Sequence, residues 1–139
     1  HMSKKKNPAA ARPPIHMIDR EADRLTELAL QKQHDLPRHY ELLLDEIDRA
    51  NICSAADIRS NVVTMGSRVT FTDEKTGNQR TVELVYPGEA NIDAGRISIL
   101  TPVGAGLIGL REGQTIRWPD RDGQDHNLSI VRVTQAEAA

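Results

Sequence analysis

The sequence predicts an α+β protein in which a short antiparallel helical hairpin is followed by a mostly antiparallel, five-stranded sheet with one short helix. Two patterns lead to this fold class. Between residues 18 and 50, apolar residues recur at spacings of three and four, which is typical of helices with one buried face. From Arg68 onward, apolar and polar residues alternate in short runs bounded by turn-forming residues, which is typical of strands. A chain of 139 residues suits one domain with a small appendage.

The chain divides into a disordered basic tail at residues 1–17, the helical hairpin at 18–52, a linker at 53–67 and the sheet domain at 68–139. The tail is rich in Pro and Ala, which favours disorder, and its charged residues are Lys4, Lys5, Lys6 and Arg12. All 20 acidic residues lie outside it, so the remainder of the chain is acidic overall. An acidic body is a poor match for the phosphates of duplex DNA, so we expect nucleic-acid contact from the tail at most.

The first helix is expected to begin at Ile18, with Asp19 as its cap, and to bury a narrow stripe of Ala22, Leu25, Leu28 and Ala29. The stretch QHDLP ends this pattern, and Pro37 suits the first turn of a second helix. The apolar stripe of that helix consists of Tyr40, Leu43, Leu44, Ile47 and Ala50. Two helices of about 14 residues form a coiled-coil hairpin roughly 20 Å long, whose tip carries His34, Asp35 and Arg38.

The linker is expected to begin with a helical turn capped by Ser54 and to become strand-like at Val62 and Val63. The five strands of the sheet are expected at residues 68–72, 79–86, 96–100, 115–118 and 127–133. Short turns that contain Gly connect the first strand to the second and the fourth to the fifth. Such connections favour antiparallel neighbours.

The stretch GAGLIG, residues 104–109, has the spacing of a dinucleotide-binding fingerprint. That motif requires a long helix after its last glycine, whereas Gly113 follows only four residues later and the next strand begins at Thr115. We therefore interpret residues 101–109 as one short helix, with Thr101 as its cap, Pro102 at its first position and Gly109 just past its end. Gly104 and Gly106 weaken such a helix, so they indicate close backbone approach, either to the sheet beneath or to a partner.

The sequence shows no motif for catalysis, for a cofactor or for a small-molecule substrate. His34 and His39 would lie on different helix faces, and no further ligand is near them in sequence, so no metal site is expected. Neither Ser98 nor Ser129 lies in a nucleophile elbow. No apolar run approaches the roughly 20 residues that span a membrane, and the single cysteine, Cys53, suits a reducing compartment. These observations favour a cytoplasmic, monomeric binding protein that is not an enzyme.

Several stretches resemble the C-terminal domain of the bacterial GreA/GreB transcription elongation factors: VVTMGSRVTF, LVYP and ISILTPVGAGLIGLREGQTIRW. Within that superfamily, NICS, NVVTM and LVYPGEA, together with the short hairpin, resemble the Rnk group, whose members are called regulators of nucleoside diphosphate kinase. The resemblance implies an FKBP-like fold for the sheet domain. It also implies that this domain binds RNA polymerase at the rim of its secondary channel.

Carried over onto this sequence, the polymerase-binding segment of the family corresponds to Thr101, Pro102 and Val103, with Gly104 and Ala105 next to it. Gre factors also present a D-x-x-E pair at the tip of a longer coiled coil, where the two acids help to hold a catalytic Mg²⁺. Here Asp35 is present, but Arg38 replaces the second acid, and a cation repels Mg²⁺. A hairpin of roughly 20 Å is also too short for that reach. The resemblance therefore implies a factor without transcript cleavage that competes with longer Gre-type factors.

Two other functions are consistent with the sequence. An FKBP-like fold would suit a peptidyl-prolyl isomerase, but such pockets are lined by several aromatic rings, and the chain has only Tyr40, Phe71, Tyr86 and Trp118. The chain could instead bind and regulate another enzyme, such as nucleoside diphosphate kinase.

Overall fold

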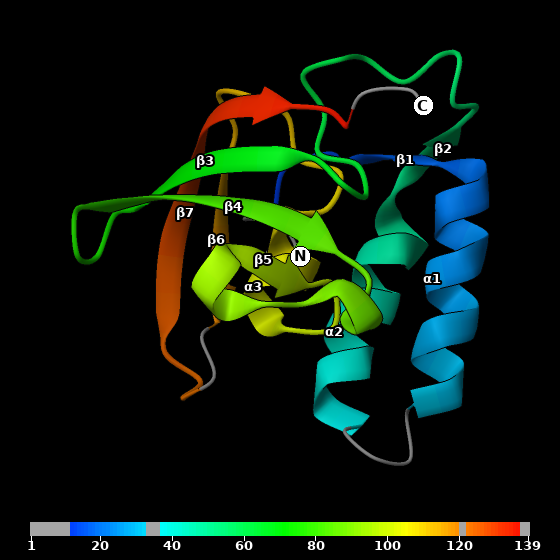
Figure 1. Ribbon diagram of the computed structural model, residues 1–139, viewed down its shortest axis with the longest axis horizontal. Coiled ribbons are helices and arrows are strands. Elements are labelled where there is room, and N and C mark those ends of the chain that lie inside the picture. The colour runs from blue at the N-terminus through cyan, green and yellow to red at the C-terminus, as the bar shows by residue number, and fades with distance from the viewer. Residues whose placement is uncertain (1–11, 33–36, 120–121, 137–139) are drawn as a thin grey trace, which may run out of the picture.

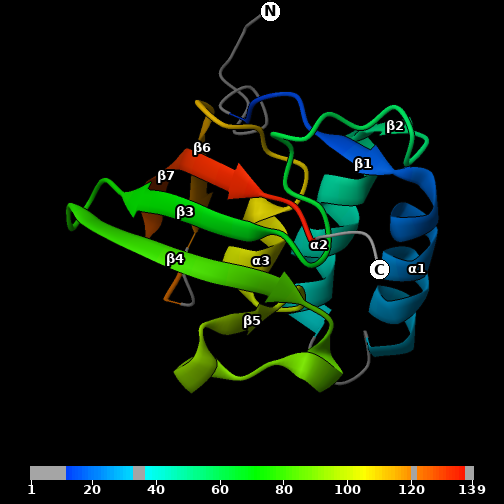
Figure 2. The same ribbon diagram turned by 45° about the horizontal axis from the view of Figure 1, so that its top comes forward.

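The computed structural model describes residues 12–32, 37–119 and 122–136, except for the side chains of residues 37–39. It confirms the α+β fold class, with a helix pair followed by a five-stranded sheet and a short helix. In Figures 1 and 2, α3 (Pro102–Leu107) overlaps the sheet, and α2 (Pro37–Arg49) and then α1 (Asp19–Lys32) follow to its right. Within the described part of the chain, no helix is long and apolar enough to cross a membrane.

The two helices of the hairpin bury much of the stripes that the periodicity predicts, and the remaining stripe residues are partly buried against the core: Leu28, Leu44, Ile47 and Ala50. In α1, Ala22, Leu25 and Ala29 are buried, and Asp19 accepts a hydrogen bond from the Arg20 amide at the first turn. In α2, Tyr40 and Leu43 are buried against the same core. The helices have 14 and 13 residues, so each is roughly 20 Å long. The expected tip residues His34 and Asp35 lie outside the described residues, as does the side chain of Arg38.

A two-stranded parallel sheet, which the periodicity did not predict, closes the base of the hairpin. Its strands are β1 (His16–Ile18), directly before α1, and β2 (Asn51–Cys53), directly after α2. Ile15 and Met17 are fully buried, although the sequence pattern assigns them to the tail. The amide of His16 also donates to the Gly109 carbonyl at 3.1 Å, so this segment contacts the sheet domain as well as the hairpin.

The main sheet has the strand order β5-β4-β3-β7-β6. Its strands are β3 (Arg68–Asp73), β4 (Asn78–Val85), β5 (Arg96–Ser98), β6 (Thr115–Pro119) and β7 (Asp125–Thr134). The pairs β3–β4, β3–β7 and β6–β7 are antiparallel, whereas β4–β5 is parallel because a ten-residue connection carries the chain back before β5 begins. The third expected strand, residues 96–100, ends early at Ser98, because Thr101 turns the chain by donating to the Ser98 carbonyl.

The inner face of the curled sheet supplies a large part of the core. The residues of its strands that are buried in the core are Val69, Phe71, Val82, Leu84, Ile97, Ile116, Trp118, Leu128, Ile130 and Val133. Helix α3 lies against this face, and α2 packs on α3 from the other side. The hairpin is therefore joined to the sheet domain through α3.

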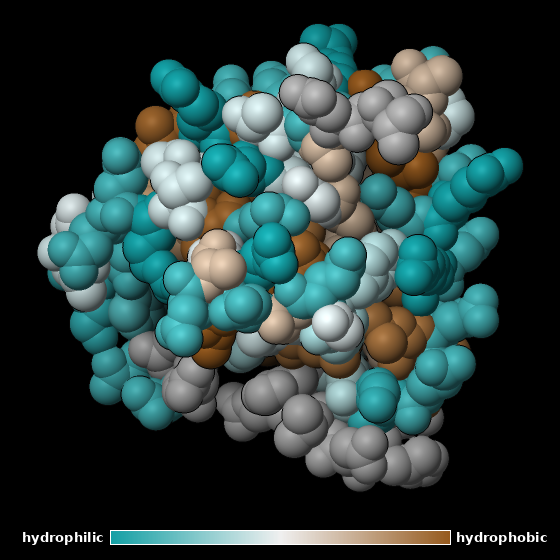
Figure 3. Space-filling view, in the orientation of Figure 1, coloured by the Kyte–Doolittle hydropathy of each residue, from teal (hydrophilic) through white to brown (hydrophobic). Residues whose placement is uncertain are grey.

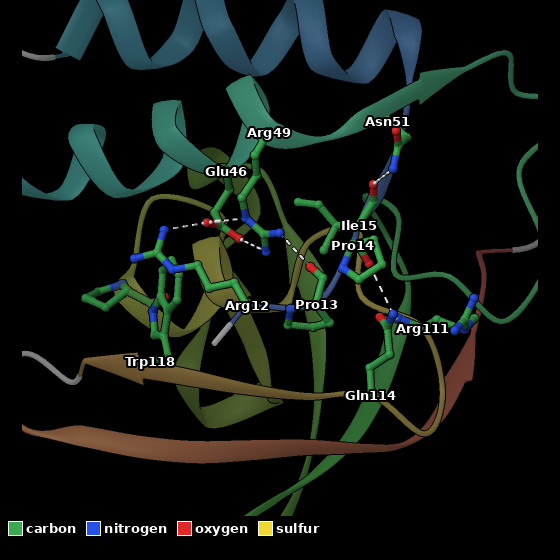
Figure 4. Close-up of polar contacts among 11 residues, drawn as sticks. Arg12, Pro13, Pro14, Ile15, Glu46, Arg49, Asn51, Arg111, Gln114 and Trp118 are labelled. Atoms are coloured by element: carbon green, nitrogen blue, oxygen red, sulfur yellow. Dashed lines mark hydrogen bonds and ion pairs between the residues drawn. The ribbon is translucent and has the colours of Figure 1, made fainter. Parts of the chain in front are cut away.

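One charged side chain of α2 points into this junction. Glu46 has no exposed surface, and its carboxylate accepts hydrogen bonds from Arg49 Nε and Nη2 at 3.0 and 2.8 Å and from Arg12 Nη1 at 3.1 Å. Arg49 Nη1 also donates to the Pro13 carbonyl at 2.5 Å. Figure 4 shows that these groups come from α2 and from the segment before β1. The buried charge is thus neutralised by residues on both sides of the junction.

Replacement of Glu46 by Gln should lower the free energy of unfolding by about 3 kcal/mol, because two partly buried guanidinium groups lose their counter-charge. Urea denaturation measures this change. Glu27→Gln on the exposed face of α1 is the matched control and should change the free energy by less than about 0.5 kcal/mol. Equal unfolding midpoints for the two variants would contradict a stabilising role for the Glu46 carboxylate.

Candidate partner-binding site

The first turn of α3 forms a rigid corner at the surface. Thr101 caps the helix: its hydroxyl accepts a hydrogen bond from the Gly104 amide at 3.1 Å and donates to the Ser98 carbonyl at 2.7 Å. Pro102 occupies the first helical position, where its fixed φ suits the helix and its lack of an N–H costs nothing. Thr101, Pro102 and Val103 are each partly exposed. We call these three residues the docking turn.

Trp118 on β6 holds the docking turn from inside. Its indole Nε1 donates to the Pro102 carbonyl at 2.5 Å, and the side chain is buried, with 2% of its surface exposed. The alternation of β6 predicted that Trp118 faces the core, but no feature of the sequence pattern indicated its contact with Pro102, 16 residues earlier. The backbone of the docking turn is therefore fixed by a side chain from another strand.

The glycines of α3 allow it to lie close to the chain's own sheet. A Cβ atom on Gly104 would lie 2.3 Å from the Ser98 carbonyl oxygen, and one on Gly106 would lie 2.9 Å from three atoms of the Trp118 ring. Ala105 is fully buried as well. Of the five residues expected to contact a partner, Gly104 and Ala105 are thus enclosed by the domain. The close approach that the glycines indicated is internal, and the partly exposed surface belongs to the docking turn.

A second contact joins α1 to the end of β4. The Glu21 carboxylate accepts a hydrogen bond from the Met65 amide at 3.0 Å. Burial raises the pKa of Glu21, and the Met65 N–H opposes this shift by stabilising the charged form. The guanidinium of Arg24 lies 4.0 Å from the centre of the Tyr86 ring, and burial raises the pKa of Tyr86. These contacts fix α1 against the sheet domain and leave the docking turn uncovered.

The aromatic rings do not form an isomerase-like groove. Tyr40, Phe71 and Trp118 each have 2% of their surface exposed, so they belong to the core. Tyr86 is covered on one face by Arg24. Three or more His, Cys, Asp or Glu side chains do not come together as a metal site would require anywhere in the described ranges, which exclude the hairpin tip.

The surface offers no broad apolar patch on the face seen in Figure 3, where hydrophobic residues occur in small groups among hydrophilic ones. Large hydrophobic side chains that are exposed lie on different elements: Leu30, Ile52, Ile92 and Val131. The exposed hydrophobic side chains therefore do not form a continuous hydrophobic area on this face.

The fold thus joins a helical hairpin to a curled five-stranded sheet through the short capped helix α3. The family of transcription elongation factors described by the GreA/GreB C-terminal domain matches residues 58–135. The chain belongs to this GreA/GreB family, as a Rnk-like member.

Relatives of similar and of greater length are known. The chain is 36% identical, over 130 residues, to the regulator of nucleoside diphosphate kinase of Escherichia coli strain K12, and the match covers 93% of this chain and 96% of that protein. It is 38% identical over 94 residues to the transcription elongation factor GreA of Azorhizobium caulinodans, of which it covers 59%. The structure resembles that of a prokaryotic GreA/GreB elongation factor from Nitrosomonas europaea, with a TM-score of 0.68, 35% identity and coverage of 88% of this chain and 99% of that one.

Replacement of Gly104 by Ala should destabilise the protein by about 2 kcal/mol, because the new methyl group would collide with backbone atoms that cannot rotate away. Gly88→Ala is the control, since a Cβ there would meet nothing within 4 Å. That variant should be neutral or slightly more stable. Thermal denaturation of both variants measures the difference, and equal midpoints would show that α3 does not lie as close to the sheet as described.

Proposed function

We propose that this protein binds RNA polymerase at the rim of the secondary channel through the docking turn and thereby regulates transcription. The observation that carries the proposal is the docking turn itself. Thr101, Pro102 and Val103 are partly exposed, yet their backbone is fixed by the cap at Thr101 and by Trp118. A surface that is rigid before binding loses little conformational entropy when a partner docks. Membership of a family of transcription elongation factors supports the choice of partner.

We further propose that the protein occupies this site without cleaving transcripts and competes with longer Gre-type factors. The hairpin helices have 14 and 13 residues and are roughly 20 Å long. The GreA protein of Azorhizobium caulinodans is a longer protein, of which this chain covers 59%. A short hairpin on the same docking domain would block the site without reaching the catalytic centre. Such a factor acts in the cytoplasm, where the polymerase is.

The name of the Escherichia coli relative favours a second candidate function. That protein is called a regulator of nucleoside diphosphate kinase, and its match extends over nearly the whole of both chains. Direct binding between this chain and a purified nucleoside diphosphate kinase, measured beside binding to polymerase, separates the two proposals. The isomerase alternative has no structural support, because three of the four aromatic rings are in the core.

Replacement of Pro102 by Glu should weaken binding to core RNA polymerase at least tenfold, because the interface would enclose an unpaired charge. Val131→Glu is the control: it places the same charge on an exposed apolar residue of β7. Titration of fluorescently labelled protein with purified polymerase measures both affinities. If Pro102→Glu binds as tightly as the control, the docking turn is not the contact surface.

Replacement of Arg38 by Glu, which restores the spacing D-x-x-E with Asp35, should not produce transcript cleavage. We expect the length of the hairpin to limit the activity even when both acids are present. A helix of 13 residues is only roughly 20 Å long. Stalled elongation complexes incubated with the variant and Mg²⁺ measure cleavage, with a Gre factor as the positive control. Shortened transcripts in the presence of the variant would refute the length argument.

A further inference from the structure

The segment before β1 brings a cation to the same tryptophan that holds the docking turn. The guanidinium carbon of Arg12 lies 5.1 Å from the centre of the Trp118 ring. Trp118 in turn donates from Nε1 to the Pro102 carbonyl at 2.5 Å. Figure 4 shows the Arg12 side chain extended between Trp118 and Glu46. One side chain thus contacts both the helical hairpin and the residue that orients the docking turn.

Two arginines, Arg12 and Arg49, contact the single carboxylate of Glu46. Arg49 alone contacts both carboxylate oxygens, from Nε at 3.0 Å and from Nη2 at 2.8 Å, and it lies on the same helix as Glu46. A two-point contact of this kind already satisfies the carboxylate. Arg12 therefore supplies a second positive charge, which it shares between Glu46 and the electron-rich face of Trp118. Neutralising the buried carboxylate does not require Arg12.

The Trp118 ring has little room to move while Arg12 is in place. Gly106 packs against the ring so closely that an added Cβ would lie 2.9 Å from three of its atoms. Only 2% of the Trp118 surface is exposed. Arg12 is a partly exposed side chain over this ring, so we expect its removal to give solvent greater access to the indole.

We propose that Arg12 is a positioning residue for partner binding, which acts through Trp118 to hold the docking turn in a fixed orientation relative to the helical hairpin. This inference rests on the proposed function, since it assigns Arg12 a part in presenting the same docking turn. It gives the segment before β1 a role beyond closing the base of the hairpin. The contact makes the hairpin and the docking turn a single unit for recognition.

The test compares Arg12→Ala with Arg132→Ala, which removes an exposed arginine on β7. Arg12→Ala should remain folded, because Arg49 still neutralises Glu46, and should bind core RNA polymerase roughly 3- to 30-fold more weakly. Trp118 is the single tryptophan of the chain, so acrylamide quenching of its fluorescence reports on this site without any partner. Quenching should increase for Arg12→Ala and stay unchanged for Arg132→Ala.

A second measurement distinguishes positioning through Trp118 from a general loss of stability. Trp118→Phe keeps an aromatic ring but removes the N–H that reaches Pro102. If Arg12 acts through this bond, the double variant should bind polymerase within about twofold of Trp118→Phe alone, because coupled residues do not have additive effects. Fully additive losses would overturn the inference.

The inference and the proposed function fail in different ways. Binding that is weakened by Pro102→Glu but unchanged by Arg12→Ala would overturn the role of Arg12 and leave the docking turn in place. Binding unchanged by Pro102→Glu would overturn the proposed function. Quenching of Trp118 that is equal in Arg12→Ala and in the unmodified protein would overturn the inference whatever the binding results.

Discussion

The neutralisation of the Glu46 carboxylate is the constraint on which the arrangement of hairpin and sheet depends. Among the described residues, it is the one ionisable side chain without exposed surface, and an unpaired charge in that place would be strongly unfavourable. Its partners come from α2 itself and from the segment before β1, and Pro14 of that segment accepts a hydrogen bond from Gln114 of the sheet domain. A helix pair with apolar stripes alone could pack on α3 in several ways. The two hydrogen bonds that join α2 to the segment before β1, from Arg12 to Glu46 and from Arg49 to the Pro13 carbonyl, select one of them.

Close packing around α3 fixes the position of the docking turn at the surface. Two glycines let the helix lie against the backbone of residues 98–99 and against the ring of Trp118, and the cap at Thr101 ends the preceding strand. The helix has six residues, which is too short to be stable alone, so its position is set by these tertiary contacts. The backbone conformation at Thr101, Pro102 and Val103 is consequently set by contacts with the core. The docking turn is therefore held in place by its neighbours, although it is partly exposed.

Local sequence patterns were sufficient to predict the helices and strands of the main fold, but not the contacts between distant segments. Spacing predicted the buried stripe at Ala22, Leu25 and Ala29, and capping chemistry predicted the start of α3 at Thr101 and Pro102. The pairing of β1 with β2 was missed because strands of three residues carry no alternation and their partners are 35 residues apart. The burial of Glu46 was missed because a carboxylate on a helix ordinarily faces water. The resemblance to a family indicated Pro102 as a contact residue, but only the coordinates reveal that Trp118 supports it and that Gly104 faces inward.

The parallel pairing of β1 with β2 has a consequence for how such proteins diverge in size. Residues 16–18 pair with residues 51–53 at the base of the hairpin. The segment between them, which contains α1 and α2, is therefore anchored at both of its ends. Whole turns can be inserted or deleted at the far end without changing the register at the base or the packing of α2 on α3. The length of the hairpin can therefore change in evolution while the sheet domain and its junction with α2 stay the same.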